Sequence, residues 1–175
     1  MTVRIKPLTL PIVAAAAAAL MPIAAGTAMT QAAKPQAAAP AAANKLVDRG
    51  RYLAKIAGCN DCHTPNYMEK AGAIPEAQWL TGDTFGWRGP WGTTYPVNLR
   101  LYMQGLTEAE WLKKAPALQA RPPMPWYVLH QMTQEDLRAI YRYIRHLGPA
   151  GVPAPAYVPP DKEPKPPYAT FPTPP

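Results

Sequence analysis

The chain has two cysteines, and their spacing points to one kind of chemistry. Cys59 and Cys62 lie three residues apart, and His63 follows the second cysteine directly. Two thiols one helical turn apart can form thioether bonds with the two vinyl groups on one edge of a haem, and the adjacent imidazole can then bind the iron. The motif therefore indicates one covalently attached haem c. Cys59 and Cys62 would be its attachment residues, and His63 would be an axial ligand of its iron.

Three other kinds of site use similar residues. A tetrahedral zinc site needs four ligands, whereas the motif offers three, and His130 and His146 form no second metal-binding pair. A thioredoxin-like thiol pair needs a βαβ context, and no parallel-strand pattern surrounds the motif. A structural disulfide between Cys59 and Cys62 stays open as an alternative in an exported protein.

A haem that is closed for electron transfer needs a second axial ligand, usually Met or His. The candidates beyond the motif are Met68, Met103, Met124, Met132, His130 and His146. Met124 lies in the run Arg121-Pro-Pro-Met-Pro-Trp126, where prolines fix the backbone on both sides of it. Such a rigid segment can hold a thioether at an iron, so we predict Met124 as the second ligand. His130 is its main rival, and a methionine that only fills a packing gap is the other alternative.

Three segments are predicted to be helices around this site. Residues 45–57 carry apolar side chains at helical spacing and lead into the motif, with Gly50 inside the helix. Residues 107–114 begin with a capping box. Residues 133–147 begin with a capping threonine and repeat apolar residues every 3.6 positions, and His146 is placed to cap the last carbonyls.

Residues 79–100 are rich in Trp, Gly, Thr, Pro and Tyr and show no clean period. We expect a structured loop that wraps something apolar. The candidates to line a haem edge are Trp79, Trp87, Trp91 and Tyr95, and the candidates to pair with a haem carboxylate are Arg88 and Arg100. Ordinary packing and surface charge are the alternative for each of them.

The composition excludes several classes of protein. The chain has 175 residues and a mean hydropathy of −0.21, which excludes a multi-span membrane protein. Its 11 glycines show no period of three, which excludes collagen, and 2 cysteines exclude a disulfide-dense scaffold. The part left to fold, residues 45–149, is short for a self-sufficient core, so a bound apolar cofactor would help to stabilise it.

The two ends differ from this folded part. Residues 1–28 combine Arg4 and Lys6 with an uncharged apolar stretch and small residues, which indicates a cleaved export signal; an uncleaved membrane anchor is the alternative. Because the signal carries two basic residues and no acid, its removal would lower the net charge from +7 to +5. Residues 29–44 are predicted to be an Ala/Pro-rich linker. Residues 150–175 are predicted to be a Pro-rich extended tail that either lies against the domain or stays loose.

The order of these features resembles the class I c-type cytochromes. The run Gly-Arg-Tyr-Leu at 50–53 is similar to the first helix of that family. The run Pro-Met-Pro-Trp at 123–126, followed by Met-Thr-Gln-Glu-Asp-Leu at 132–137, is similar to the bacterial monohaem branch found in oxidoreductase gene neighbourhoods. The resemblance covers residues 45–149 and implies an all-α, cytochrome c-like helical domain wrapped around one covalently bound haem.

The resemblance also implies two contacts. The first and last helices of the family cross at close range, which places Gly50 against Tyr141 or Ile144. A proline carbonyl often orients the proximal histidine in the family, and Pro75 is the candidate here.

Together, these observations predict a periplasmic electron carrier, rather than an enzyme, that moves one electron at a time between redox partner proteins. The positive net charge favours acidic partners, and we expect no binding to nucleic acid. The first alternative is a haem subunit fixed to a membrane dehydrogenase or oxidase complex. The second is a haem enzyme whose open iron acts on peroxide or a small gas, with His130 or Tyr127 as distal groups, although no acid–base pair lies near the motif.

Overall fold

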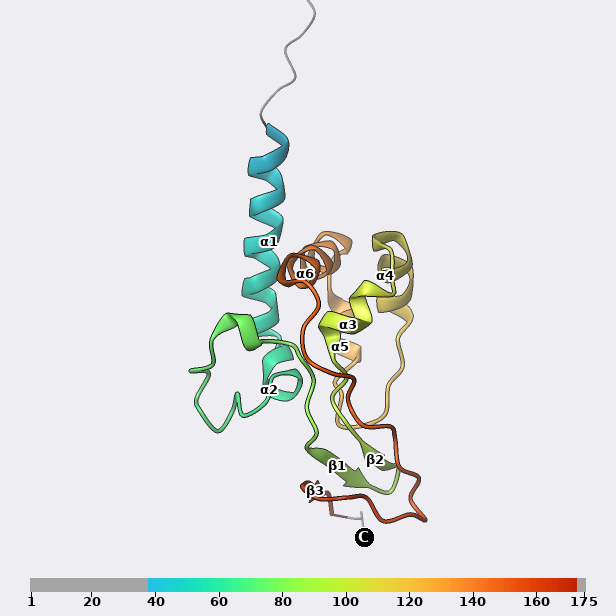
Figure 1. Ribbon diagram of the computed structural model, residues 1–175. Coiled ribbons are helices and arrows are strands. Elements are labelled where there is room, and N and C mark those ends of the chain that lie inside the picture. Colours follow the sequence, from blue (N-terminus) through green and yellow to red (C-terminus); the bar gives the residue numbers. More distant parts are fainter. Residues whose placement is uncertain (1–37, 173–175) are drawn as a thin grey trace, which may run out of the picture. The chain divides into compact units, whose positions relative to one another are not determined.

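The computed structural model describes residues 38–172, which form several helices and one small sheet (Figure 1). The α-helices are α1 (Ala38–Ile56), α2 (Cys59–His63), α3 (Leu99–Gln104), α4 (Glu108–Lys114), α5 (Tyr127–Gln131) and α6 (Gln134–Leu147). The strands are β1 (Gly86–Gly89), β2 (Gly92–Thr94) and β3 (Tyr168–Thr170), and the short 3₁₀ helices are η1 (Glu76–Gln78) and η2 (Ala115–Ala117). The expected export signal, residues 1–28, lies outside the described residues.

Helices α1 and α6 pack together and carry much of the core (Figure 1). Gly50 of α1 faces α6, where an added Cβ would lie 2.1 Å from the Ala139 carbonyl oxygen and 2.5 Å from Tyr143 Cβ. The close crossing implied by the resemblance is therefore present. Its partners are Ala139 and Tyr143 and not Tyr141 or Ile144, because α6 presents a different face to the glycine.

The helix starts follow the capping signals in the sequence. Thr107 Oγ1 accepts a hydrogen bond from the Glu110 amide at 3.2 Å, and Glu110 Oε2 accepts one from the Thr107 amide at 2.7 Å, so the capping box of α4 is confirmed. Thr133 Oγ1 accepts one from the Asp136 amide at 3.1 Å at the start of α6. Both caps satisfy amides that the first turn of a helix leaves without a partner.

The end of α6 is capped by an unexpected residue. Arg100 donates from Nε to the Gly148 carbonyl at 2.6 Å, from Nη2 to the Leu147 carbonyl, and from Nη1 to the Ala77 carbonyl at 2.7 Å. His146, which we expected to do this, is exposed and makes no such bond within residues 38–172. A buried guanidinium reaches the last carbonyls of the helix and counters its dipole more effectively than an exposed imidazole on the helix itself.

The expectation of an all-α fold needs correction, because the mostly helical domain also holds a three-stranded sheet of order β2-β1-β3. Strands β1 and β2 form an antiparallel hairpin inside residues 79–100, which we expected to be a loop. Strand β3 pairs parallel to β1. Strands of three or four residues are too short to show a period of two, and the partner of β1 is distant in sequence, so neither signal was visible.

The C-terminal segment, residues 150–172, lies against the domain, which is the first of the two arrangements we expected. Val158 exchanges two backbone hydrogen bonds with Thr93, at 2.7 and 3.0 Å. Phe171 packs on the rings of Trp87 and Trp91, with centroids 5.9 and 5.4 Å apart. Polyproline-like backbone has few donors, so side-chain contacts and isolated bridges attach this segment.

Helix α1 begins at Ala38, inside the predicted linker, so residues 38–44 are helical. Alanine has the highest helix propensity, and a proline near the first turn is tolerated, which accounts for the longer helix. Within residues 38–172, none of the helices has the length and apolar character needed to cross a membrane.

Candidate functional site

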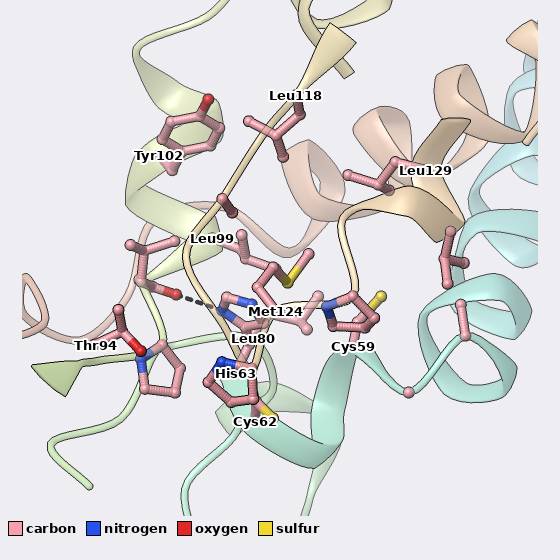
Figure 2. A pocket seen from close by; sticks show the side chains of 18 of the residues that line it. Cys59, Cys62, His63, Leu80, Thr94, Leu99, Tyr102, Leu118, Met124 and Leu129 are labelled. Carbon is pink, nitrogen blue, oxygen red and sulfur yellow. Dashed lines mark hydrogen bonds between the residues drawn. The ribbon is translucent and has the colours of Figure 1, made fainter. Parts of the chain in front are cut away.

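Helix α2 places the three motif residues on one short helical turn. Gly58 precedes it with φ +69°, a left-handed conformation that glycine adopts without strain, and this residue turns the chain from α1 into α2. The backbone of α2 then brings Cys59, Cys62 and His63 to the same cavity (Figure 2). The predicted grouping of these three side chains is present in the structure.

A small hydrogen-bond network fixes α2 on the following loop. Thr64 Oγ1 donates to Asn60 Oδ1 and accepts from the Leu80 amide, both at 2.8 Å. The Gly82 amide donates to the His63 carbonyl at 2.8 Å. Asn60 and Thr64 are buried, and nothing in the local sequence marked them as supports of the motif. These bonds hold the motif rigidly, as a site with fixed geometry requires.

Both cysteines are free thiols in the structure, so they form no disulfide with each other. Burial raises the pKa of Cys59 to about 11, and burial with the nearby Asp61 also raises the pKa of Cys62. The thiols of thiol-redox enzymes have lowered pKa values instead, because their thiolates must be populated at neutral pH. The environment of this pair is therefore unlike that of a thioredoxin-type site.

His63 is buried and oriented by one hydrogen bond. Its Nδ1 lies 2.7 Å from the Val97 carbonyl oxygen, and because a carbonyl can only accept, Nδ1 carries the proton. Burial lowers the pKa of His63, so the ring is neutral and the lone pair of Nε2 is free to bind a metal. The expected partner, Pro75, is replaced by Val97, which follows β2 and precedes α3.

A cavity of about 430 Å³ is lined by residues of helices α1 to α6. Its lining is predominantly aliphatic and aromatic. It includes Leu80, Leu99, Tyr102, Leu118 and Leu129 (Figure 2), and also Trp111, Ile140 and Ile144. Its volume is typical of a pocket for a small-molecule or cofactor ligand. An apolar ring system bound in this cavity would complete the small hydrophobic core.

Met124 lies in this cavity with His63 and both cysteines (Figure 2). His130, its main rival, does not border the cavity, because its Nε2 donates to the Leu118 carbonyl at 2.8 Å and its ring packs on Trp126. Met68 is 56% exposed, away from the cavity. Among the described methionines considered as the second axial ligand, Met124 is the one that both borders the cavity and lies between two prolines.

The other candidate ligands have structural places. Met103 is 1% exposed within α3, and Met132 joins α5 to α6; both border the cavity and both pack against the hydrophobic core. His146 is exposed on α6 and does not border the cavity. Within residues 38–172, the structure therefore brings three methionines to the cavity wall and no histidine other than His63.

The candidates in residues 79–100 divide between the cavity and the surrounding structure. Trp87 and Tyr95 border the cavity, whereas Trp79 donates to the Ile74 carbonyl and Trp91 packs on Phe171. Arg100 caps α6, and Arg88 forms an ion pair with Glu163 in the C-terminal segment. Neither arginine borders the cavity, so neither is placed to pair with a carboxylate there.

The charge at the cavity comes from a residue that we did not single out. Among the described residues that border the cavity there is no Lys, Asp or Glu, and Arg121 is the one arginine. Its guanidinium lies 3.8 Å from the centroid of the Tyr157 ring, and Tyr157 also borders the cavity. The sequence offered Tyr157 as a contact between the tail and the domain, but it did not pair Tyr157 with Arg121, because the two residues are 36 positions apart.

These residues fit a c-type haem. The site offers two free thiols at the required spacing, an imidazole whose Nε2 is unprotonated, a thioether, and an apolar enclosure. Among residues 38–172 there is no cluster of three or more His, Cys, Asp or Glu side chains suited to a metal ion, so a zinc site has no basis there. Helices from both ends of the domain enclose a single cavity, which is the arrangement of a haem-binding helical domain.

The chain belongs to the cytochrome c family, because the family model for Cytochrome c matches residues 47–148. Its haem c is covalently bound through Cys59 and Cys62. The match ends one residue beyond α6, so it leaves out the C-terminal segment that carries β3 and Tyr157.

Among curated proteins, the chain is similar to the fructose dehydrogenase cytochrome subunit of Gluconobacter japonicus, with 29% identity over 70% of this chain and 26% of the relative. It is also similar to the cytochrome c subunit of alcohol dehydrogenase (quinone) from Gluconacetobacter polyoxogenes and from Komagataeibacter europaeus, each with 27% identity over 74% of this chain and 26% of the relative. The chain thus spans about a quarter of the length of these relatives. No solved structure matches it at a significant level.

Proposed function

We propose that this cytochrome carries one electron at a time between redox partners in the periplasm, with His63 and Met124 as the axial ligands of its haem. The observation that carries the proposal is the shared cavity, which holds the attachment cysteines, an oriented imidazole and a thioether within apolar walls. The bound haem supplies a single redox-active iron that cycles between the ferric and ferrous states.

The protein's own residues hold this centre fixed. The Val97 carbonyl keeps the proton on Nδ1 of His63, which leaves the lone pair of Nε2 available to bind the iron. The prolines on either side of Met124 restrict its backbone, so the thioether needs little rearrangement on electron transfer. The aliphatic lining excludes water, and thioether ligation together with low polarity favours the less charged, reduced centre.

No general acid or base is needed for this role, and the cavity offers no pair for one. His63 is engaged at Nδ1. Of the two distal groups of the catalytic alternative, His130 is turned to the Leu118 carbonyl, and Tyr127 is exposed and does not border the cavity. These residues support electron transfer. They do not favour a reaction that makes or breaks bonds in a substrate.

A second candidate follows from the relatives. Each of them is described as a cytochrome subunit of a dehydrogenase. This chain would then deliver electrons as a haem subunit bound to a membrane dehydrogenase or oxidase complex. Carbonate extraction of membranes separates the two: a free carrier is released into the supernatant, and a subunit fixed by a membrane anchor stays in the pellet.

Optical spectra of the ferric, ferrous and carbon monoxide-treated ferrous protein test the proposed ligands. We expect a low-spin c-type spectrum, a Met-to-iron charge-transfer band and no spectral change with carbon monoxide. Met124→Ala should lose the band, bind carbon monoxide and lower the potential. Met68→Ala, which changes an exposed methionine, is the matched control and should resemble the parent protein. A parent protein that already binds carbon monoxide would overturn the closed site.

A further inference from the structure

The segment that carries Met124 has contacts with two elements far away in sequence. We call residues 121–126 the Met segment. Thr94, the last residue of β2, donates from Oγ1 to the Pro122 carbonyl at 2.7 Å, a shorter distance than the 3.5 Å to its other acceptor, the Trp87 carbonyl. Arg121 lies with its guanidinium 3.8 Å from the centroid of the Tyr157 ring. The Met segment is thus held on one side by the sheet and on the other by the C-terminal segment.

The C-terminal segment is itself fixed where it makes this contact. Tyr157 donates from its hydroxyl to the Trp91 carbonyl at 2.8 Å, and its neighbour Val158 exchanges two backbone hydrogen bonds with Thr93. Thr93 precedes Thr94, so one short stretch of β2 holds both the C-terminal segment and the Met segment. Pro155 and Tyr157 also form part of the cavity wall.

Few backbone bonds hold the part of the Met segment that precedes Pro125. The Met124 amide donates to the Arg121 carbonyl at 3.3 Å and the Trp126 amide to the Met124 carbonyl at 2.9 Å, whereas the carbonyls of Pro125 and Trp126 accept from Val128 and Leu129 of α5. Prolines restrict the shape of the segment, but they remove amides that would attach it to its surroundings. Side-chain contacts with other elements therefore add to the hold of α5 on this segment.

We propose that Thr94 and Tyr157 are positioning residues that hold the Met segment against the cavity, so that the C-terminal segment keeps the sixth coordination position of the iron closed. The proposal rests on the proposed function, in which Met124 is the second axial ligand. It adds that this ligand depends on a segment outside the matched cytochrome c domain. Release of that segment would open the iron to an external ligand without any change in the motif.

The experiment measures carbon monoxide binding to ferrous full-length protein in parallel with the Met-to-iron charge-transfer band of the ferric form. Thr94→Val removes the hydrogen bond and keeps the shape of the side chain, and Tyr157→Leu removes the ring beneath Arg121. The loss of one hydrogen bond or one exposed cation–π contact corresponds to about a two- to tenfold rise in the fraction with Met124 released. Carbon monoxide should therefore bind about two- to tenfold faster to each variant, and faster still to the double variant.

The controls separate this effect from general loss of stability. Thr94→Ser retains the hydroxyl and should restore the parent rate. Thr107→Val removes a threonine hydrogen bond at the α4 cap, and Tyr52→Leu removes the ring that faces Arg49 on α1; neither residue borders the cavity. Both controls should leave the carbon monoxide rate unchanged. Tyr157 is 36% exposed, so its replacement should still give folded protein.

The role of Met124 as a ligand and the positioning role of Thr94 and Tyr157 can fail separately. If the parent protein lacks the charge-transfer band and binds carbon monoxide, the proposed ligand is wrong and the positioning role falls with it. If the parent is closed and Met124→Ala opens it, but Thr94→Val and Tyr157→Leu match the parent, the positioning role alone is overturned. A Thr94→Ser variant as open as Thr94→Val would also overturn it, since the hydroxyl would then be irrelevant.

Discussion

The Gly50 Cα lies so close to α6 that a Cβ placed on it would be 2.1 Å from the Ala139 carbonyl oxygen. The same atom would be 2.5 Å from Tyr143 Cβ. Neither neighbour is the movable end of a side chain, so α1 and α6 can approach this closely only with glycine at the crossing. Because residues of both helices border the cavity, this contact also sets part of the shape of the haem site.

Gly50→Ala should therefore destabilise the protein even though alanine favours helices. Overpacking at a backbone contact costs about 1–3 kcal/mol of unfolding free energy, which outweighs the gain of about 1 kcal/mol in helix propensity. Urea unfolding of the ferric protein measures the difference. Gly105→Ala is the matched control, because its new Cβ would meet only the Tyr102 carbonyl oxygen at 3.6 Å. Equal unfolding free energies for the two variants would contradict the close crossing.

Arg100 gives a second prediction about stability. Two backbone carbonyls at the end of α6, those of Leu147 and Gly148, and the Ala77 carbonyl of η1 accept its hydrogen bonds, and it is 6% exposed. Arg100→Met would leave those carbonyls without their partner, at a cost of about 2–4 kcal/mol. Arg88→Met removes a surface ion pair with Glu163 and should have a much smaller effect, because solvent screens exposed ion pairs. Thermal unfolding of the two ferric variants should place Arg100→Met well below Arg88→Met, and the reverse order would refute the capping role.

The ion pair between Arg49 and Asp136 joins α1 to α6 and gives a pH dependence. Arg49 donates to Asp136 Oδ1 at 2.8 Å, and this contact is the main reason why the pKa of Asp136 is lowered. A lowered pKa contributes stability above the ordinary value of the carboxyl group, near pH 4, and that stability is lost as the pH falls through the folded-state value. The parent protein should therefore exceed Asp136→Asn by about 0.5–1 kcal/mol at pH 7, and this gap should close below about pH 4.

Glu135→Gln is the control for that comparison. It removes the same charge from the same first turn of α6, and Glu135 makes no ion pair within residues 38–172. Its smaller effect at pH 7 would isolate the contribution of Arg49. A gap between the parent and Asp136→Asn that stayed constant from pH 7 to pH 3 would show that the ion pair is not its cause.

Covalent attachment predicts a stepwise loss of haem. Cys59→Ala or Cys62→Ala should each retain haem through one thioether bond, and the double variant should retain none after denaturation. Mass spectrometry of the denatured protein measures the bound haem directly. Met103→Ala, which changes a sulfur residue at the same cavity, should keep the full haem mass. Haem mass that persists in the denatured double variant would contradict attachment through these two cysteines.

The sequence predicted what depends on neighbouring residues and missed what depends on distant ones. The caps at Thr107 and Thr133 and the grouping in α2 follow from residues within one turn of each other, and these were predicted. The partner of His63 lies 34 positions away, and Val97 presents a backbone carbonyl that no side-chain pattern reveals. The all-α expectation was wrong for a similar reason, because β3 comes from a proline-rich segment that pairs with a strand about 80 residues earlier.

Arg121 and Tyr157 show the same limit at the candidate site. The proline-rich run predicted that the Met segment is rigid. The contact that holds this segment involves Tyr157, which lies in a C-terminal segment whose sequence shows no secondary-structure signal. Arg121 and Tyr157 meet because their segments attach to the neighbouring residues Thr94 and Thr93 of β2, a pairing that only the whole fold determines. Local periodicity could place Met124 in a rigid segment, but it could not show what presses that segment against the cavity.

Removal of the haem should unfold the domain. The cavity of about 430 Å³ is bounded by side chains of helices α1 to α6, so the apoprotein would lose the contacts that the haem makes with these walls. Those contacts are a large share of the apolar burial of a small domain, whose whole stability is about 5–15 kcal/mol. We therefore expect the Cys59→Ala/Cys62→Ala variant, freed of haem, to lack a cooperative urea transition by circular dichroism, while the haem-loaded parent shows one. A cooperative transition in the haem-free variant would mean that the helices form a self-sufficient core, and that the haem occupies a cavity whose walls stand without it.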